Sequence, residues 1–205
     1  MKSPAIVASA GRHTRRRPSP LAVDAAGYVR AAVQVASPNC DDRPHHTPIT
    51  LAVVHGISLP PGEFGGDAIE RLFTNRLDAA AHPYFASIAT LRVSSHFLVR
   101  RDGALVQFVP CARRAWHAGP SAWRGVPRCN DYSIGIELEG TDTDAYEDPQ
   151  YATLARLCRV LMRRYPIADV AGHSDIAPSR KTDPGPAFDW RRLERALRRP
   201  LRSGK

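Results

Sequence analysis

The sequence has few cysteines and no long apolar run. Its four cysteines are far apart and form no C-x-x-C pair, which excludes a thiolate zinc knuckle and a dithiol redox motif and favours reduced thiols. No apolar stretch approaches the ~20 residues that cross a bilayer, so no membrane-spanning helix is predicted. The stretch "AIVASA" near the N-terminus is too short for the apolar core of a secretory signal. We therefore expect a cytoplasmic protein with no membrane partner.

The length and composition fit one domain. With 205 residues, of which 43% are hydrophobic, the chain can bury one core and has little room for a second. We expect a disordered basic extension over residues 1–23, a domain over residues 24–199 and a tail over residues 200–205. No internal repeat is visible, and we expect a monomer.

The net charge of +9 raises nucleic-acid binding as an alternative function. Many of the arginines lie in "RHTRRRP" near the start and "DWRRLERALRRPLRSGK" at the end, and terminal runs of this kind are usually solvated. The sequence has no recognisable nucleic-acid recognition module. We therefore expect no nucleic-acid partner.

The first half of the chain alternates between strand-like and helix-like segments. The β-branched run "TLAVVH" predicts a buried strand over residues 50–55 that ends at His55. Asp67, with Glu70 three places on, predicts a capping box at the start of a helix. The apolar face of this helix is formed by Ile69, Leu72, Phe73 and Leu77. Residues 95–110 read as a hairpin with a two-residue turn at Asp102-Gly103.

The second half continues the alternation. "YSIGIELEG" has the period of a strand with one buried face, which places Glu137 and Glu139 together on the other face. Asp148-Pro149 predicts the start of a long helix that ends at Tyr165-Pro166, "VAGH" is a short strand that ends in His173, and Asp189 caps a terminal helix. These elements predict an α/β domain with a central mixed β-sheet flanked by helices.

Two strands that end in histidine suggest a metal site at the strand ends. His55 and His173 end their strands, and Asp183 follows His173 by ten residues inside the stiff, proline-rich "KTDPGP". Catalytic zinc is typically held by three such ligands, with a fourth position left for water or substrate. A strand-end histidine is more often a satisfied polar residue, Asp183 could merely start a turn, and the rival ligands are His82, His96 and His117. Spacing alone leaves these alternatives open.

Four segments carry a resemblance to a known family. "VVHGISLPPGEFGG", "RAWHAG", "NDYSIGIELEGTD" and "GHSDIAPSRKTDPGPAFDW" resemble the zinc-dependent N-acetylmuramoyl-L-alanine amidases, a family that includes phage lysozyme-type amidases and peptidoglycan recognition proteins. The likeness runs in register over residues 35–190. It implies hydrolysis of the amide bond between N-acetylmuramic acid, in its 1,6-anhydro form, and the L-alanine of muropeptides. This reaction belongs to peptidoglycan recycling and is linked to β-lactamase induction.

The resemblance also implies roles for single residues. His55, His173 and Asp183 would bind one Zn²⁺ per chain, Glu137 would be the catalytic carboxylate, and Lys181 would lie beside the metal. Some family members hold muropeptide without cleaving it after losing a zinc ligand. All three ligand positions are filled here, so we expect an enzyme.

Substrate contacts are less well defined by the sequence. The family pattern often has Asn where this chain has Gly56, which puts any side-chain contact from that position in doubt. Arg92 and Arg128 are candidates for binding the carboxylates of an anhydro-muropeptide, with surface arginine as the alternative. Trp116 and His117 are candidates for the saccharide pocket, although Trp116 could equally belong to the core.

Overall fold

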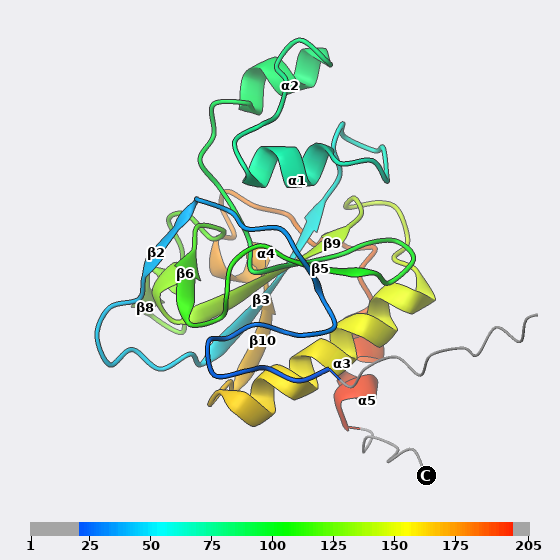
Figure 1. Ribbon diagram of the computed structural model, residues 1–205. Coiled ribbons are helices and arrows are strands. Elements are labelled where there is room, and N and C mark those ends of the chain that lie inside the picture. Colours follow the sequence, from blue (N-terminus) through cyan, green and yellow to red (C-terminus); the bar gives the residue numbers. More distant parts are fainter. Residues whose placement is uncertain (1–20, 199–205) are drawn as a thin grey trace, which may run out of the picture.

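The computed structural model of the protein describes residues 21–198 (Figure 1). The sequence-based expectations for residues 1–20 and 199–205 lie outside the described residues. Within them, Leu21 and Val23 pack against the core, and Val23 forms an isolated antiparallel bridge with Val29. The packed part of the chain therefore includes residues 21–23, which the sequence placed in the extension.

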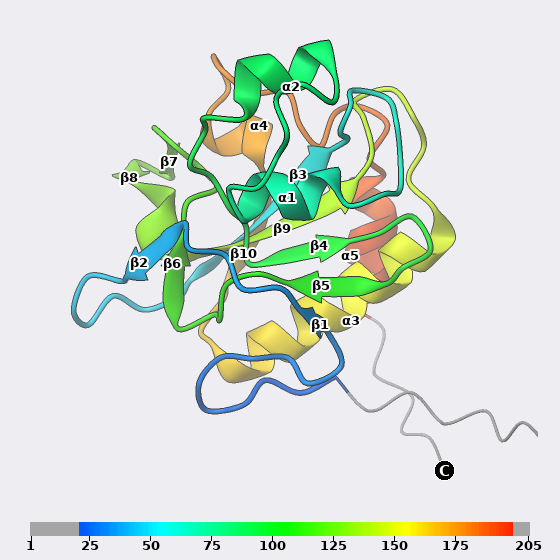
Figure 2. The ribbon, with the colours of Figure 1, turned by 45° about the horizontal axis from the view of Figure 1, so that its top comes forward.

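A six-stranded mixed sheet forms the centre of the molecule, as the sequence predicts (Figures 1 and 2). Only the β4–β5 pair is antiparallel, and the other four neighbouring pairs of this sheet are parallel. In spatial order the strands are β1 (Val33–Gln34), β5 (Leu105–Gln107), β4 (Phe97–Val99), β9 (Ser133–Glu139), β3 (Leu51–Ile57) and β10 (Asp169–Gly172).

Helices cover both faces of this sheet (Figure 2). On one face, α3 (Asp148–Arg164) and α5 (Trp190–Arg198) pack against Ile134, Ile136 and Leu138 of β9. On the other face, α1 (Ala68–Phe73) and α2 (Pro83–Ile88) pack over Leu98 of β4, and α4 (His173–Ile176) packs over β3. Two small antiparallel pairs and a 3₁₀ turn complete the fold: β2 (Cys40–Asp42) with β6 (Arg113–Ala115), β7 (Ala122–Trp123) with β8 (Val126–Pro127), and η1 (Cys129–Asp131).

Strand β9 differs from the sequence-based expectation of one buried face. All seven of its residues are buried, including Glu137 and Glu139. The reason is its central position, because β4 and β3 pair with its two edges and α3 packs on one face. On the other face, His117 lies against Gly135, and the backbone of residues 65 and 101 covers Glu139. Buried carboxylates are costly unless they are paired or functional, so both glutamates call for an explanation.

The helix starts agree only in part with the sequence-based predictions. Asp189 caps α5, since its Oδ1 accepts a hydrogen bond from the Arg192 N–H at 2.9 Å. The capping box predicted for α1 is wrong, because the Asp67 carboxylate pairs with Arg71 and Glu70 pairs with Arg100. Helix α1 also ends at Phe73, so the buried side chain of Leu77 lies beyond it.

Two further local predictions are wrong by one residue. The N-terminal cap of α3 is Glu147 instead of Asp148. The side chain of Gln150 accepts a hydrogen bond from the backbone N–H of Glu147 at 3.0 Å. The β4–β5 hairpin has a three-residue loop over residues 101–103, because the N–H of Arg100 donates to the carbonyl of Ala104 at 2.9 Å. Gly103 has a φ of +83°, a conformation that glycine adopts without strain.

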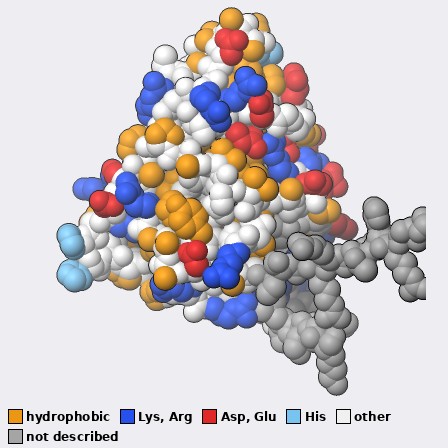
Figure 3. All heavy atoms as spheres, in the orientation of Figure 1, with side chains coloured by type: hydrophobic (Ala, Val, Ile, Leu, Met, Phe, Trp, Pro, Cys, Tyr) orange, Lys and Arg blue, Asp and Glu red, His pale blue; other side chains and the backbone are white. Residues whose placement is uncertain are grey.

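In the part of the chain that the structure describes, no helix is both long and apolar enough to cross a membrane. On the face shown in Figure 3, basic and acidic side chains are interspersed.

Candidate active site

The parallel pairing of β3 and β10 brings two histidines together. Gly172, the last residue of β10, lies opposite Val54 of β3, so the residues that follow these two, His173 and His55, are neighbours. His173 is the first residue of α4, and His55 lies inside β3, which continues to Ile57. The sequence-based prediction that both histidines end their strands is therefore wrong in detail, but the pairing of β3 with β10 still brings the two residues together.

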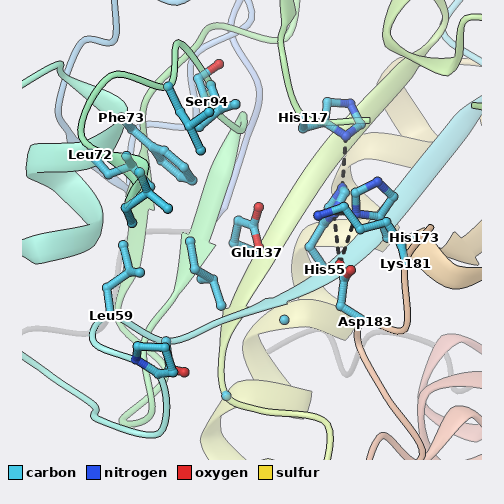
Figure 4. Close-up of a pocket in the computed structure, with 18 of the residues that line it drawn as sticks. His55, Leu59, Leu72, Phe73, Ser94, His117, Glu137, His173, Lys181 and Asp183 are labelled. Atoms are coloured by element: carbon cyan, nitrogen blue, oxygen red, sulfur yellow. Dashed lines mark hydrogen bonds and ion pairs between the residues drawn. The ribbon is translucent and has the colours of Figure 1, made fainter. Parts of the chain in front are cut away.

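The side chains of His55, His173 and Asp183 converge on one point (Figure 4). The Nδ1 atoms of the two histidines are 2.9 Å apart, and they lie 3.2 and 3.1 Å from Oδ2 of Asp183. These separations are compatible with one zinc ion held by all three atoms at the usual ligand distance of ~2.0–2.2 Å. The donor set therefore fits a metal ion of the zinc type.

The charge states in the cluster suit metal binding. Burial is the main cause that lowers the pKa of His55 to about 4, which keeps this ring neutral at pH 7. Burial by itself would raise the pKa of Asp183, but its close contacts with the rings of His173 and His55 outweigh burial and hold this pKa well below its usual range. Neutral imidazoles and an ionised carboxylate are the forms that bind metal ions.

Glu137 lies directly opposite His55 in the register of β3 and β9. Its side chain faces the same cavity as the cluster, and among residues 21–198 no group donates a hydrogen bond to its carboxylate (Figure 4). Burial raises the pKa of Glu137 well above its usual value, the charge of Asp183 adds to this effect, and Lys181 opposes it. A carboxylate that is buried, unpartnered and aimed into a cavity is typical of a group that acts on a ligand.

Glu139 has a different environment. Its carboxylate accepts hydrogen bonds from the N–H of Gly65 at 2.6 Å, from the N–H of Arg101 at 3.2 Å and from the guanidinium of Arg100 at 3.1 Å. These contacts tie the loop before α1 to the β4–β5 hairpin, and the side chain is 2% exposed. Glu139 is thus a structural acid in the part of the chain described.

The cluster and Glu137 line a groove of about 380 Å³. One wall is apolar, as Figure 4 shows for Leu59, Leu72 and Phe73, and Tyr84 and Ile88 of α2 continue this wall. Lys181, half-buried, borders the groove beside the cluster. The sequence placed Leu72 and Phe73 on the apolar face of a helix, but it did not predict that they line a groove or that α2 continues its wall. The apolar face of residues 68–73 was the one signal for the α1 part of this wall, and a core helix shows the same pattern.

The substrate-binding candidates divide into two pairs. Trp116 and His117 line the groove, and their contact with a saccharide stays a prediction. Arg92 and Arg128 are not among the residues that line the groove. Arg92 is exposed, and its guanidinium donates to the carbonyl of Thr90 at 3.2 Å. Arg128 forms an ion pair with Asp131 at 2.9 Å.

The rival ligands do not join the cluster. His96 is buried beside β9, where its Nδ1 accepts from the N–H of Gly135 at 3.0 Å and its Nε2 lies 3.1 Å from the carbonyl of Arg113. His82 caps α2 by accepting from the N–H of Tyr84 at 3.1 Å. His117 contacts the ring of His55 on the side away from Asp183.

Gly56, which follows the first histidine, fits against a tyrosine. The hydroxyl of Tyr146 donates to the carbonyl of Pro184 at 2.9 Å, which fixes it beside the loop that carries Asp183. A Cβ atom at position 56 would collide with this hydroxyl. The family's side chain at this position therefore has no room here unless Tyr146 moves.

We expect Gly56→Ala to lower the free energy of unfolding by about 1–3 kcal/mol, the usual cost of overpacking. Urea denaturation of the single and double variants measures it. The penalty should shrink when Gly56→Ala is introduced into a Tyr146→Phe background, because phenylalanine lacks the colliding oxygen. An equal penalty in both backgrounds would show that the collision is not the cause.

A mixed sheet with converging His, His and Asp side chains and a buried acid beside them is typical of a metal-dependent hydrolase. The chain belongs to the N-acetylmuramoyl-L-alanine amidase family, whose pattern matches residues 45–186. The family assignment made from the sequence is thereby confirmed.

Similar proteins agree with this assignment. The 1,6-anhydro-N-acetylmuramyl-L-alanine amidase AmpD of Escherichia coli K12 is 60% identical over 169 residues, which cover 82% of this chain and 92% of that protein. A crystal structure of a selenomethionine AmpD derivative superposes with a TM-score of 0.81 at 58% identity and covers 84% of this chain and 97% of that one. The amidase AmiD of E. coli, solved with anhydro-N-acetylmuramic acid-L-Ala-D-γ-Glu-L-Lys, has a TM-score of 0.54 at 32% identity, covering 85% of this chain and 65% of that one.

Proposed function

We propose that the protein is a zinc-dependent amidase that cleaves the bond between 1,6-anhydro-N-acetylmuramic acid and L-alanine in muropeptides, as part of peptidoglycan recycling. The observation that carries this proposal is the convergence of His55, His173 and Asp183 at a groove that also holds the unpartnered carboxylate of Glu137. The names and sequences of the AmpD relatives support the substrate. One zinc ion per chain, a monomer and a cytoplasmic location are part of the same proposal.

Zinc, when bound by these three ligands, supplies a Lewis acid that polarises a carbonyl and lowers the pKa of a water molecule to ~7. Glu137 is placed to take the proton from the attacking water, because its carboxylate lies in the same groove and has no competing hydrogen bond. The protonated Glu137 then delivers this proton to the nitrogen of the leaving L-alanine. Its burial, which raises the pKa of the carboxyl group, makes the carboxylate a stronger base and so favours the first of these steps.

Lys181 is proposed to stabilise the negative charge that develops on the amide oxygen. The groove-facing ammonium needs no movement of solvent to act, since it is held beside the cluster by the loop that contains Asp183. Trp116 and the apolar wall are proposed to contact the saccharide, while His117, Arg92 and Arg128 stay predictions as substrate contacts.

Digestion of purified anhydro-muropeptide, analysed by mass spectrometry, tests the function. We expect free peptide and anhydro-N-acetylmuramic acid as products, with loss of turnover in the presence of a chelator and recovery after zinc is added. Turnover that is unaffected by complete zinc removal would contradict the proposed chemistry, and no cleavage by the zinc-loaded protein would contradict the proposed substrate.

A further inference from the structure

A chain of hydrogen bonds leads from His55 away from the metal cluster. The Nε2 atom of His55 lies 2.9 Å from Nδ1 of His117, and Nε2 of His117 lies 3.1 Å from Oγ of Ser133. The Ser133 hydroxyl donates to the backbone carbonyl of Cys129 at 2.6 Å. The mechanism proposed above uses neither His117 nor Ser133.

The direction of every hydrogen bond in this chain follows from its last member. A carbonyl oxygen only accepts, so the single hydroxyl proton of Ser133 is committed to Cys129, and Oγ is left to accept. Nε2 of His117 must then carry a proton and donate to Ser133, which leaves Nδ1 of a neutral His117 as an acceptor. That acceptor takes the Nε2 proton of His55, and the free lone pair of His55 is therefore on Nδ1.

Nδ1 is the atom of His55 that faces the cluster. It lies 2.9 Å from Nδ1 of His173 and 3.2 Å from Oδ2 of Asp183. The other histidine follows the same rule, because Nε2 of His173 lies 3.2 Å from the carbonyl of Ala118, which can only accept its proton. Each ring thus presents an unprotonated nitrogen to the proposed ion.

The surroundings of His117 are shaped to hold this ring. Gly135 of β9 lies beneath it, and a Cβ atom there would be 2.5 Å from Cγ of His117. Asn130 accepts from the backbone N–H of His117 at 3.2 Å through its side-chain oxygen. The rings of His117 and His55 are nearly perpendicular, at 88° with centroids 5.0 Å apart, and they meet through the contact between Nδ1 and Nε2.

We propose that His117, oriented by Ser133, is a positioning residue that fixes the tautomer and ring orientation of His55 and thereby raises zinc affinity. His117 is not itself a ligand, because its Nδ1 accepts the proton of His55 and its Nε2 donates a proton to Ser133. This inference rests on the zinc site of the proposed function. Outer partners of metal-bound histidines typically contribute 10–100-fold to metal affinity.

The matched variants His117→Asn and His117→Leu test the inference. Their side chains have nearly the same shape, but only asparagine has an oxygen close to the position of Nδ1, where it can accept the proton of His55. Competition with a chromophoric chelator gives the zinc dissociation constant of each purified variant. We expect His117→Leu to bind zinc about 10–100-fold more weakly than the unaltered protein, and His117→Asn to recover most of this loss.

Equal zinc affinity in the two variants would overturn the inference, since a merely structural effect of replacing the ring is shared by both. If the unaltered protein itself binds no zinc, the proposed metal site fails and the inference with it. If it binds zinc and the two variants do not differ, the inference alone fails.

Nitrogen NMR of the histidine rings gives a test that does not depend on how the variants fold. In the zinc-loaded protein we expect His117 to carry its only ring proton on Nε2.

Ser133→Ala removes the acceptor of that proton. We expect this variant to bind zinc more weakly than the unaltered protein, by a smaller factor than His117→Leu. A proton on Nδ1 of His117 in the zinc-loaded protein would overturn the proposed hydrogen-bond direction.

Discussion

Glu137→Gln is expected to lower amide hydrolysis by at least ~100-fold while fold and zinc content stay unchanged, because a positioned general base contributes typically 10²–10⁴-fold. Glutamine preserves the size of the side chain but cannot accept a proton from water. The carboxylate takes part in no hydrogen bond among the described residues, so its replacement removes no contact that holds the sheet together. Turnover of anhydro-muropeptide and zinc content, measured on the same preparation, check the result.

Glu139→Gln is the matched control for this prediction. The two glutamates lie on the same strand with the same orientation, but Glu139 is bound to Gly65, Arg101 and Arg100 instead of facing the groove. We expect its replacement to affect stability more than turnover, since the charge that Arg100 pairs with is lost. Equal, small losses of turnover in both variants would remove Glu137 from the mechanism, and a larger loss in Glu139→Gln would reverse the assignment.

The difference between these two acids shows what the sequence could and could not predict. Alternation in "YSIGIELEG" correctly predicts a strand with both acids on one face. It cannot show that the strand is central in the sheet, because full burial depends on β3 and β4, which come from distant parts of the chain. The partners of Glu139 likewise come from residues 65, 100 and 101, and no local pattern links them to position 139.

The metal cluster was easier to predict than the groove. Strand patterns and the proline-rich "KTDPGP" suggested His55, His173 and Asp183 as a set, and the family resemblance favoured this set over the rival histidines. These signals are local in the sequence. The role of His117 could not be predicted from the sequence, which suggested only a rival metal ligand or a saccharide contact. Only the three-dimensional contact with Ser133 shows which nitrogen of His117 is protonated.

His173→Ala is expected to lose zinc almost completely, with an affinity reduced by more than about 100-fold, which exceeds the effect of an outer partner such as His117. The physical reason is that only two ligands, His55 and Asp183, remain to bind the ion. The smaller alanine side chain also leaves space for water where the His173 ring was. Metal analysis after dialysis against a weak chelator measures the occupancy. Zinc should also raise the melting temperature of the unaltered protein and not that of the variant, because only a bound ligand stabilises the fold.

His82→Asn is the control for the loss of a histidine as such. His82 accepts from the N–H of Tyr84 at the start of α2, and asparagine is also a good N-terminal cap, so this variant should keep its full zinc content. Full zinc occupancy in His173→Ala would show that the ligand assignment is wrong. The alternative ligand to test would then be His117, because it lines the groove beside His55, whereas His82 and His96 do not line it.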